Sequence, residues 1–94
     1  MITQAKIDAV KQYLRAEFPG FQVTEREVEV YRQFTVIKDS TTFYKLQPIG
    51  YFWTCVEDVK KALEDWGISK FMKNNLKGTV FVDEKGQIQC FDDQ

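Results

Sequence analysis

The feature that most constrains this chain is the stretch 21–46, where apolar and polar residues alternate with the two-residue period of a half-buried strand. Four apolar side chains are predicted to share one face of a long strand: Val28, Val30, Phe34 and Val36. The pair Asp39-Ser40 favours a hairpin centred on residues 39–41, with a return strand over 42–46. Residues 24–27 contain no Gly, Pro or Asn, so we expect a bulge or bend there rather than a tight turn.

Helical patterns flank this stretch. A helix over residues 4–17 is predicted from the three- and four-residue spacing of its apolar side chains, with Thr3 as its N-cap. The run Thr54-Cys55-Val56-Glu57 has the form of a capping box, which predicts that a second helix begins at Thr54. Gly67 is placed to end that helix in the left-handed conformation, and a short helical turn over 69–75 follows.

Two further strands are expected over 78–83 and 87–91, joined by a turn in which Gly86 takes a positive φ. The order is therefore α-β-β-β-α-(α)-β-β. Hairpin-connected strands with helices predict an α+β fold, in which an antiparallel sheet of about five strands carries two main helices on one face. The predicted core is Ile7, Val10, Leu14, Phe21, Val23, Val30, Phe34, Val36, Leu46, Val59, Leu63, Trp66, Phe71, Val80 and Val82.

Length and composition limit the function classes. Ninety-four residues predict a single domain over 1–94, and 44% hydrophobic with 29% charged residues is typical of a globular chain. The formal net charge of −1 gives no overall attraction to nucleic acid. The absence of histidine removes the commonest general base and metal ligand, and two cysteines cannot complete a structural zinc site. We therefore expect no catalytic residue, metal or cofactor.

The cysteines and the hydropathy pattern bear on location. Cys55 and Cys90 form no Cys-x-x-Cys pair, and both are interpreted as reduced thiols, Cys90 in the core beside Ile88. The most hydrophobic stretch, 49–56, is far shorter than the ~20 residues that a membrane helix needs. We expect a cytoplasmic protein that has no membrane partner.

The aromatic residues are the strongest pointer to a binding surface. Consecutive residues of an extended segment point to opposite sides, so the triplet Tyr51-Phe52-Trp53 either exposes one side or is buried as a folded loop. Tyr and Trp are favoured anchors at protein interfaces. The predicted partner-binding residues are Tyr31, Tyr44, Tyr51 and Trp53. The leading hypothesis is a non-enzymatic interaction module of adaptor, chaperone-like or inhibitor type, which binds another protein or forms a homodimer.

Two alternatives use other residues. Lys70, Lys73 and Lys77 lie in a stretch without acidic residues at helical spacing, which allows weak binding to nucleic-acid phosphates. Cys55 is expected in the first turn of the second helix, where the helix dipole stabilises a thiolate, and this allows a thiol-dependent activity. Glu57 and Asp58 in the same turn oppose that thiolate.

The order of elements resembles two known arrangements. Its first five elements follow the order of double-stranded RNA-binding domains, but Cys55, Glu57 and Asp58 stand where that family has lysines. The longer order is similar to that of dimeric bacterial secretion chaperones, without their final helix. The second resemblance implies a protein that holds an unfolded polypeptide segment. Both rest on element order alone, and neither rests on a motif.

Overall fold

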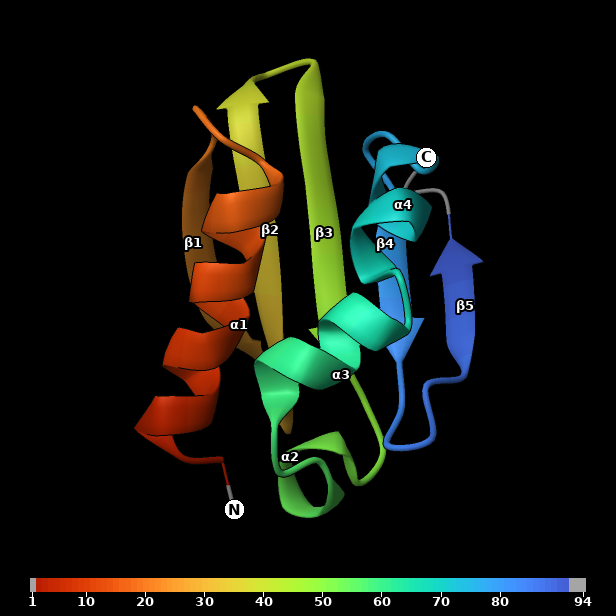
Figure 1. Ribbon diagram of the computed structural model, residues 1–94. Helices are drawn as coiled ribbons and strands as arrows, with labels where there is room; N and C mark the ends of the chain where they lie inside the picture. The colour runs from red at the N-terminus through yellow and green to blue at the C-terminus, as the bar shows by residue number, and fades with distance from the viewer. Residues whose placement is uncertain (1, 92–94) are drawn as a thin grey trace.

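A computed structural model describes residues 2–91 of the chain (Figure 1). Helix α1 (Gln4–Glu17) precedes three strands, β1 (Gln22–Val28), β2 (Tyr31–Asp39) and β3 (Thr42–Pro48). Three short helices follow, namely α2 (Phe52–Cys55), α3 (Val59–Asp65) and α4 (Ile68–Lys73), and then β4 (Thr79–Val82) and β5 (Ile88–Phe91). No helix within residues 2–91 is long and apolar enough to cross a bilayer.

The predicted α+β class and the five-stranded sheet are confirmed, but the sheet is mixed. Its strands lie in chain order, β1-β2-β3-β4-β5, and every neighbouring pair is antiparallel except β3 and β4. The chain leaves the end of β3, passes through three helices and returns to the end of the sheet at which β3 began. It then enters β4 in the same direction as β3. A parallel pair requires such a crossover, whereas a hairpin turn can only join antiparallel strands.

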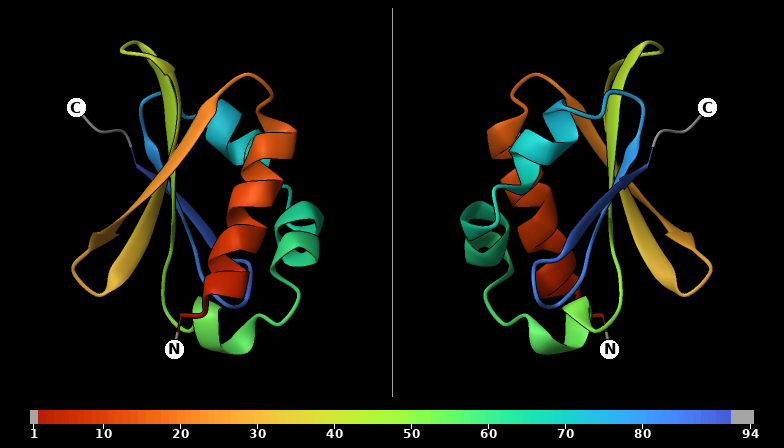
Figure 2. Two further views of the ribbon diagram at one scale, coloured as in Figure 1. Left: turned by 90° about the vertical axis from the view of Figure 1, so that its left-hand side faces the viewer. Right: turned by 90° about the vertical axis from the view of Figure 1, so that its right-hand side faces the viewer.

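All the helices of the described chain cover one face of the sheet, and the other face carries none (Figure 2). Helix α1 packs on β1 and on α3, and α4 packs on β3 and β4. The core lies between the two layers. Its fully buried larger side chains are Leu14, Phe34, Leu46, Phe52, Leu63, Ile68 and Met72.

The first helix has the predicted start. The Thr3 hydroxyl accepts a hydrogen bond from the Lys6 amide at 3.3 Å, as expected of an N-cap residue. The apolar side of α1 is buried, and so is Tyr13 beside it. Phe18, the C-cap residue, is 3% exposed and extends the core beyond the end of the helix.

The junction between β1 and β2 differs from the prediction. The turn is at Glu29-Val30, between the paired residues Val28 and Tyr31, and not near residues 24–27. Glu29 has a left-handed φ of 57°, which residues other than Gly, Asn and Asp seldom adopt. The residue type at this position therefore gave no local signal for the turn. The prediction of one long strand that contains both Val28 and Phe34 is therefore wrong. Val30 is 80% exposed and is not a core residue.

The predicted capping box is also wrong. Thr54 lies inside α2, the chain is extended at Val56, and Asp58 is the N-cap of α3, where its carboxylate accepts from the Lys61 amide at 3.2 Å. Asp caps as well as Thr does, so local capping preference does not favour Thr54 over Asp58. In the structure with this break, Phe52, Trp53 and Val56 are all buried. Gly67 has the predicted left-handed φ, 65°, and α4 begins directly after it.

Most of the predicted core is confirmed. Ten members are buried: Ile7, Val10, Leu14, Phe34, Val36, Leu46, Val59, Leu63, Val80 and Val82. Phe21, Val23 and Trp66 are half-buried against the core. Phe71 is 41% exposed because Ile68 and Met72, four residues apart, take the inner side of α4. Cys90 is exposed on β5, so its assignment to the core is wrong.

Candidate interaction surface

The side of the five-stranded sheet that carries no helix is here called the open face (Figure 2). Residues paired across strands point to the same side of the sheet. Phe34 is buried under the helices and pairs with Glu25, so the neighbouring residues of each strand point to the open face. Its central members are Thr24, Arg26, Tyr31, Gln33, Thr35, Ile37, Phe43, Lys45, Gln47, Thr79, Phe81, Gln89 and Phe91.

A row of hydrogen-bonded side chains crosses the middle of the open face. The Gln33 Oε1 accepts from the guanidinium of Arg26 at 3.2 Å, and the Gln33 Nε2 donates to the Gln47 Oε1 at 3.2 Å. Gln33 and Gln47 are only 8% and 7% exposed although no helix covers them. Buried amides need such partners, so this row holds neighbouring side chains in fixed positions.

Aromatic rings flank this amide row. Phe81 and Phe91 meet edge to face with ring centroids 5.3 Å apart, and Phe91 is 54% exposed. The Lys45 ammonium lies 5.6 Å from the centre of the Phe43 ring. Rigid rings beside ordered amides are typical of protein-binding surfaces, because little conformational entropy is lost when they are covered.

The charge on the open face has one sign. Its charged members within the paired strands, Arg26 and Lys45, are both basic. The acidic residues of β1 lie on the other side, where Glu25 pairs with Lys11 at 3.0 Å and with Arg32 at 3.3 Å, and Glu27 pairs with Arg32 at 3.0 Å. The fold therefore separates the acidic residues of β1 from the open face.

The four residues predicted to bind a partner are not brought together. Tyr31 is half-buried on the open face, at the start of β2. Tyr44 lies on the helix side, where its ring packs 5.2 Å from that of Phe18 and 6.0 Å from that of Phe21. Tyr51 is 70% exposed at the N-cap of α2, where its amide donates to Glu84 at 2.8 Å.

Trp53 is a core residue in this fold. It is 7% exposed, and its ring packs against those of Phe34 and Phe52 at centroid distances of 6.1 and 5.1 Å. The carbonyl oxygen of Trp53 accepts from the Lys6 ammonium at 2.7 Å, which ties α2 to α1. Its assignment as a surface anchor is therefore wrong, because the helical turn at residues 52–55 rotates the side chain inward.

Of the three lysines of the nucleic-acid alternative, two lie on α4 and the third lies in the turn between α4 and β4. Lys70 and Lys73 are exposed on the helix, and the Lys73 ammonium lies 5.2 Å from the centre of the Phe18 ring. Lys77 has a left-handed φ of 65° and donates its amide to the Phe43 carbonyl at 2.8 Å. Lys70 and Lys73 therefore lie apart from the rings of the open face, whereas Lys77 is tied to the backbone of Phe43, one of those ring residues.

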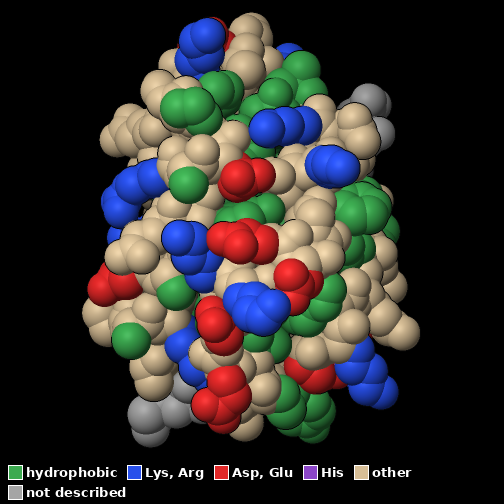
Figure 3. Space-filling view, in the orientation of Figure 1, with side chains coloured by type: hydrophobic (Ala, Val, Ile, Leu, Met, Phe, Trp, Pro, Cys, Tyr) green, Lys and Arg blue, Asp and Glu red, His purple; other side chains and the backbone are tan. Residues whose placement is uncertain are grey.

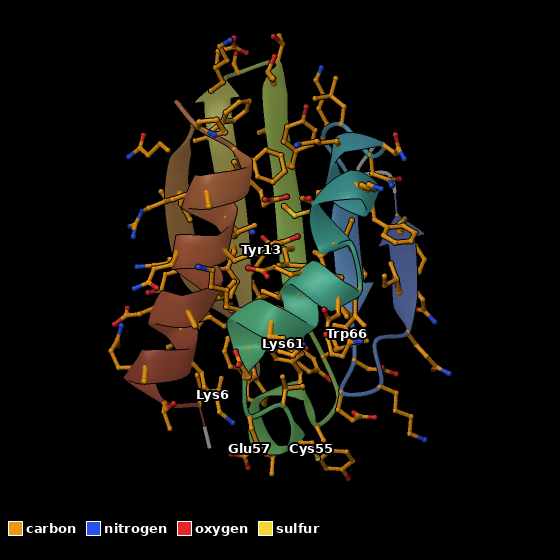
Figure 4. The ribbon with its side chains drawn as sticks, viewed as in Figure 1. Lys6, Tyr13, Cys55, Glu57, Lys61 and Trp66 are labelled. Atoms are coloured by element: carbon orange, nitrogen blue, oxygen red, sulfur yellow. The ribbon has the colours of Figure 1, made fainter. Side chains whose placement is uncertain are left out.

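Cys55 was predicted at the N-terminal end of a helix, but it lies at the C-terminal end of α2. It is exposed and is the last residue of α2, so the amides of a helix start do not surround it. The physical basis of the thiol hypothesis, a helix N-terminus, is therefore missing. Figure 4 shows Cys55 at the lower end of the molecule, near Glu57.

A shallow groove of about 400 Å³ lies between α1 and α3, lined by Ala5, Lys6, Ala9, Glu57, Asp58, Val59 and Lys60. The described residues contain no cluster of three or more metal-ligating side chains. The groove mixes charges of both signs, and Lys6 and Asp58 are already held by Trp53 and Lys61, so it has no evident ligand class.

A buried polar contact joins α1 to α4. The Tyr13 hydroxyl accepts from the Ser69 amide at 2.9 Å, and the Ser69 hydroxyl donates to Glu17 at 2.6 Å (Figure 4 labels Tyr13). Gly67 provides no side chain to cap α4, so Tyr13 supplies the acceptor from another helix. Burial raises the pKa of Tyr13 above its ordinary value, and the hydrogen bonds from Ser69 partly offset this.

Neither a family model, nor a curated protein, nor a solved structure matches this chain. The geometry is therefore the basis for any assignment. Sequence reasoning missed Phe43, Phe81 and Gln47 as surface residues. Their signal was present in the alternation within 42–48 and 79–82, but it became readable only once the covered side of each strand was known.

Proposed function

We propose that this protein is a non-enzymatic, cytoplasmic interaction module that binds a polypeptide on the open face of its sheet. The observation that carries the proposal is a five-stranded face without a covering helix, on which ordered rings and amides stand beside basic groups only. Exposed faces of this kind are suited to a partner that supplies apolar contacts and carboxylates. The partner is thus a polypeptide segment rich in apolar and acidic side chains.

A polypeptide fits better than a nucleic acid. Single-stranded nucleic acids also stack on rings, but their binding depends on a basic groove that follows the phosphates. Lys70 and Lys73 belong to α4 in the helix layer and do not line the open face. The chain as a whole carries a net charge of −1, which opposes non-specific attraction to phosphates.

Of the residues first expected to bind the partner, Tyr31 keeps that role in the proposal. It joins Phe81 and Phe91 as ring contacts, and Arg26 provides the charge that recognises a carboxylate. Arg is favoured for this because its planar guanidinium can hold a carboxylate through two hydrogen bonds. Tyr44 and Trp53 act indirectly, because they support the fold from the helix side.

The test is native mass spectrometry of the tagged protein, captured gently from the lysate of its own host. The double variant Tyr31→Ala/Phe81→Ala is compared with the matched helix-side variant Thr54→Ala/Lys61→Ala, both of whose residues are exposed. We expect the open-face variant to retain a polypeptide at least about tenfold less than the wild type, because aromatic anchors dominate interface energies. The helix-side variant should retain it fully.

Three results would contradict the proposal. One is a captured polypeptide that is lost with the helix-side variant and kept by the open-face variant. Another is a captured nucleic acid, released by salt and by a Lys70→Gln/Lys73→Gln/Lys77→Gln variant. The third is a bare chain from lysates in which the protein is abundant.

A further inference from the structure

The hydrogen bonds of the amide row all run in one direction. An arginine side chain has N–H donors and no acceptor, so only the oxygen of a neighbouring amide can face it. The Gln33 Oε1 accordingly accepts from the Arg26 Nε at 3.4 Å and from its Nη2 at 3.2 Å. The Gln33 Nε2 then faces Gln47, where only the Oε1 can accept, at 3.2 Å. Arg26 therefore fixes the orientation of both amides, although an isolated amide can turn over.

The row ends in N–H donors on both sides. The Gln47 Oε1 is occupied by Gln33, so the Gln47 Nε2 points away from Gln33. This nitrogen has no hydrogen-bond partner within the described chain. It is not one of the buried polar atoms that lack a partner, which in this part of the chain are Arg32 Nε and Trp53 Nε1. The Gln47 Nε2 therefore reaches the surface of the open face, beside Phe81, with which Gln47 pairs.

Arg26 supplies the other end of the row, and its charge has no acidic partner. Arg26 is exposed and forms no ion pair within the described chain. Glu25 and Glu27, its neighbours on β1, point to the helix side, and Glu29 lies in the turn after the strand. The acidic pair Asp92-Asp93 follows β5 in the sequence, and β5 is the edge of the sheet opposite to β1. An incoming anion therefore meets Arg26 without displacing a carboxylate of the described chain.

The helix side of the molecule lacks this arrangement. In Figure 3, acidic and basic side chains lie next to one another over α1 and α3. Some of them are already paired, as the Lys61 ammonium is with the Asp65 carboxylate at 3.3 Å. Donors of one kind beside aromatic rings are thus a property of the open face, where Phe81 packs against Phe91.

We propose that the amide row makes the open face selective for a partner segment that carries carboxylates. One carboxylate binds Arg26, and a second acceptor of the same segment, a carboxylate or a backbone carbonyl, binds the Gln47 Nε2. The strands of Arg26 and Gln47 are two spacings apart, roughly 10 Å, which about three extended residues span. Arg26 is thus both a contact and the residue that positions the two amides. A cationic segment of the same length meets only donors there and is rejected.

The chemistry of the partner rests on the open-face function proposed above, but the direction of the row can be tested without a partner. Arg26→Glu places an acceptor at the start of the row, so the Gln33 Nε2 should turn toward position 26 and the Gln47 oxygen should face the surface. Nuclear Overhauser contacts of the Gln33 amide protons should then move from the Gln47 side chain to that of residue 26. The matched control Arg15→Glu, at an exposed position of α1, should leave them unchanged. Contacts that stay with Gln47 in Arg26→Glu overturn the proposal.

Fluorescence anisotropy tests the selectivity with two labelled peptides, in which Leu alternates with Glu or with Lys. We expect the wild type to bind the Leu–Glu peptide about tenfold more tightly, because hydrogen bonds from a guanidinium to a carboxylate are the stronger kind. Gln47→Glu exchanges one N–H donor for an acceptor of the same shape and should remove most of this preference. The matched control Gln22→Glu adds the same charge at an exposed open-face position outside the row and should keep the preference. If circular dichroism shows that Gln47→Glu does not fold, Arg26→Glu, which keeps both amides, makes the same comparison.

The outcomes separate the selectivity of the row from the open-face function. Equal binding of the two peptides by the wild type overturns the selectivity. So does a preference that Gln47→Glu retains in full, or one that falls as much in Gln22→Glu. In each of these cases the open-face function stands if Tyr31→Ala/Phe81→Ala loses both peptides. A wild type that binds neither peptide overturns the open-face function and the selectivity with it.

Discussion

The two faces of this sheet reach similar burial by different means. On the covered face, Phe34 and Leu46 are fully buried because helices pack over them. On the open face, Gln33 and Gln47 come from the same two strands and are less than a tenth exposed, yet only neighbouring side chains cover them. Burial by a helix layer removes apolar surface from water and stabilises the fold. Burial within the open face orders polar groups and leaves a surface that another chain can cover.

The largest effect should separate the ring residues of the two faces. Phe34→Ala leaves a cavity beneath the helices and should lower the free energy of unfolding by about 3–5 kcal/mol. Phe81→Ala removes a half-buried ring from the open face and should lower it by about 1 kcal/mol. Urea unfolding measures both. Equal losses of unfolding free energy in the two variants would show that Phe81 belongs to the core as Phe34 does. The contrast between the covered face and the open face would then be wrong.

The amide row offers a sharper test of the open face. Gln33→Leu leaves the buried Gln47 oxygen without its donor and should destabilise the fold by about 1–2 kcal/mol. The double variant Gln33→Leu/Gln47→Leu removes both partners and should be more stable than the single variant, because two apolar groups replace an unsatisfied one. The comparison is made by thermal unfolding. A double variant that loses the sum of two independent penalties would show that the two amides act separately.

The smallest effect concerns the helix layer at high pH. Because burial raises the pKa of Tyr13 in the folded protein, the folded state holds this proton more tightly than the unfolded chain does. The contribution of protonated Tyr13 to the free energy of unfolding is complete below about pH 10. It is lost as the pH rises through the higher pKa of Tyr13 in the folded protein. Tyr13→Phe removes this part of the alkaline decline, along with the acceptor for the Ser69 amide. The stability gap between wild type and variant should therefore narrow above about pH 10, and parallel curves would contradict the assignment.

The elements that sequence predicted best are those whose signals are local. Helix α1 has its N-cap at Thr3 and its apolar stripe in place, and both follow from residues within one helix. The hairpin between β2 and β3 was found from Asp39-Ser40, where the Asp39 carboxylate accepts from the Thr41 amide at 2.9 Å. Gly86 has the expected positive φ, 78°. Each of these depends on the chemistry of a few neighbouring residues.

The failures arose where local signals were weak or competed. Glu29 has no intrinsic preference for the turn that it forms, so only the pairing of β1 with β2 fixes that turn. Thr54 and Asp58 are both good N-caps, and the burial of Trp53 and Val56 decides between them. The same choice reversed the position of Cys55 in its helix and removed Trp53 from the candidate site.

By itself, the sequence determined the class of the fold, most of the core and the lack of histidine chemistry, because periodicity and composition are properties of the chain alone. It could not determine which side of the sheet the helices cover or that β3 and β4 run parallel. Those depend on how a crossover of three helices returns across the sheet, which is a balance of long-range packing. The amide row and the ring pair of Phe81 and Phe91 form a surface only after that choice, since residues far apart in the chain become neighbours through the strand register.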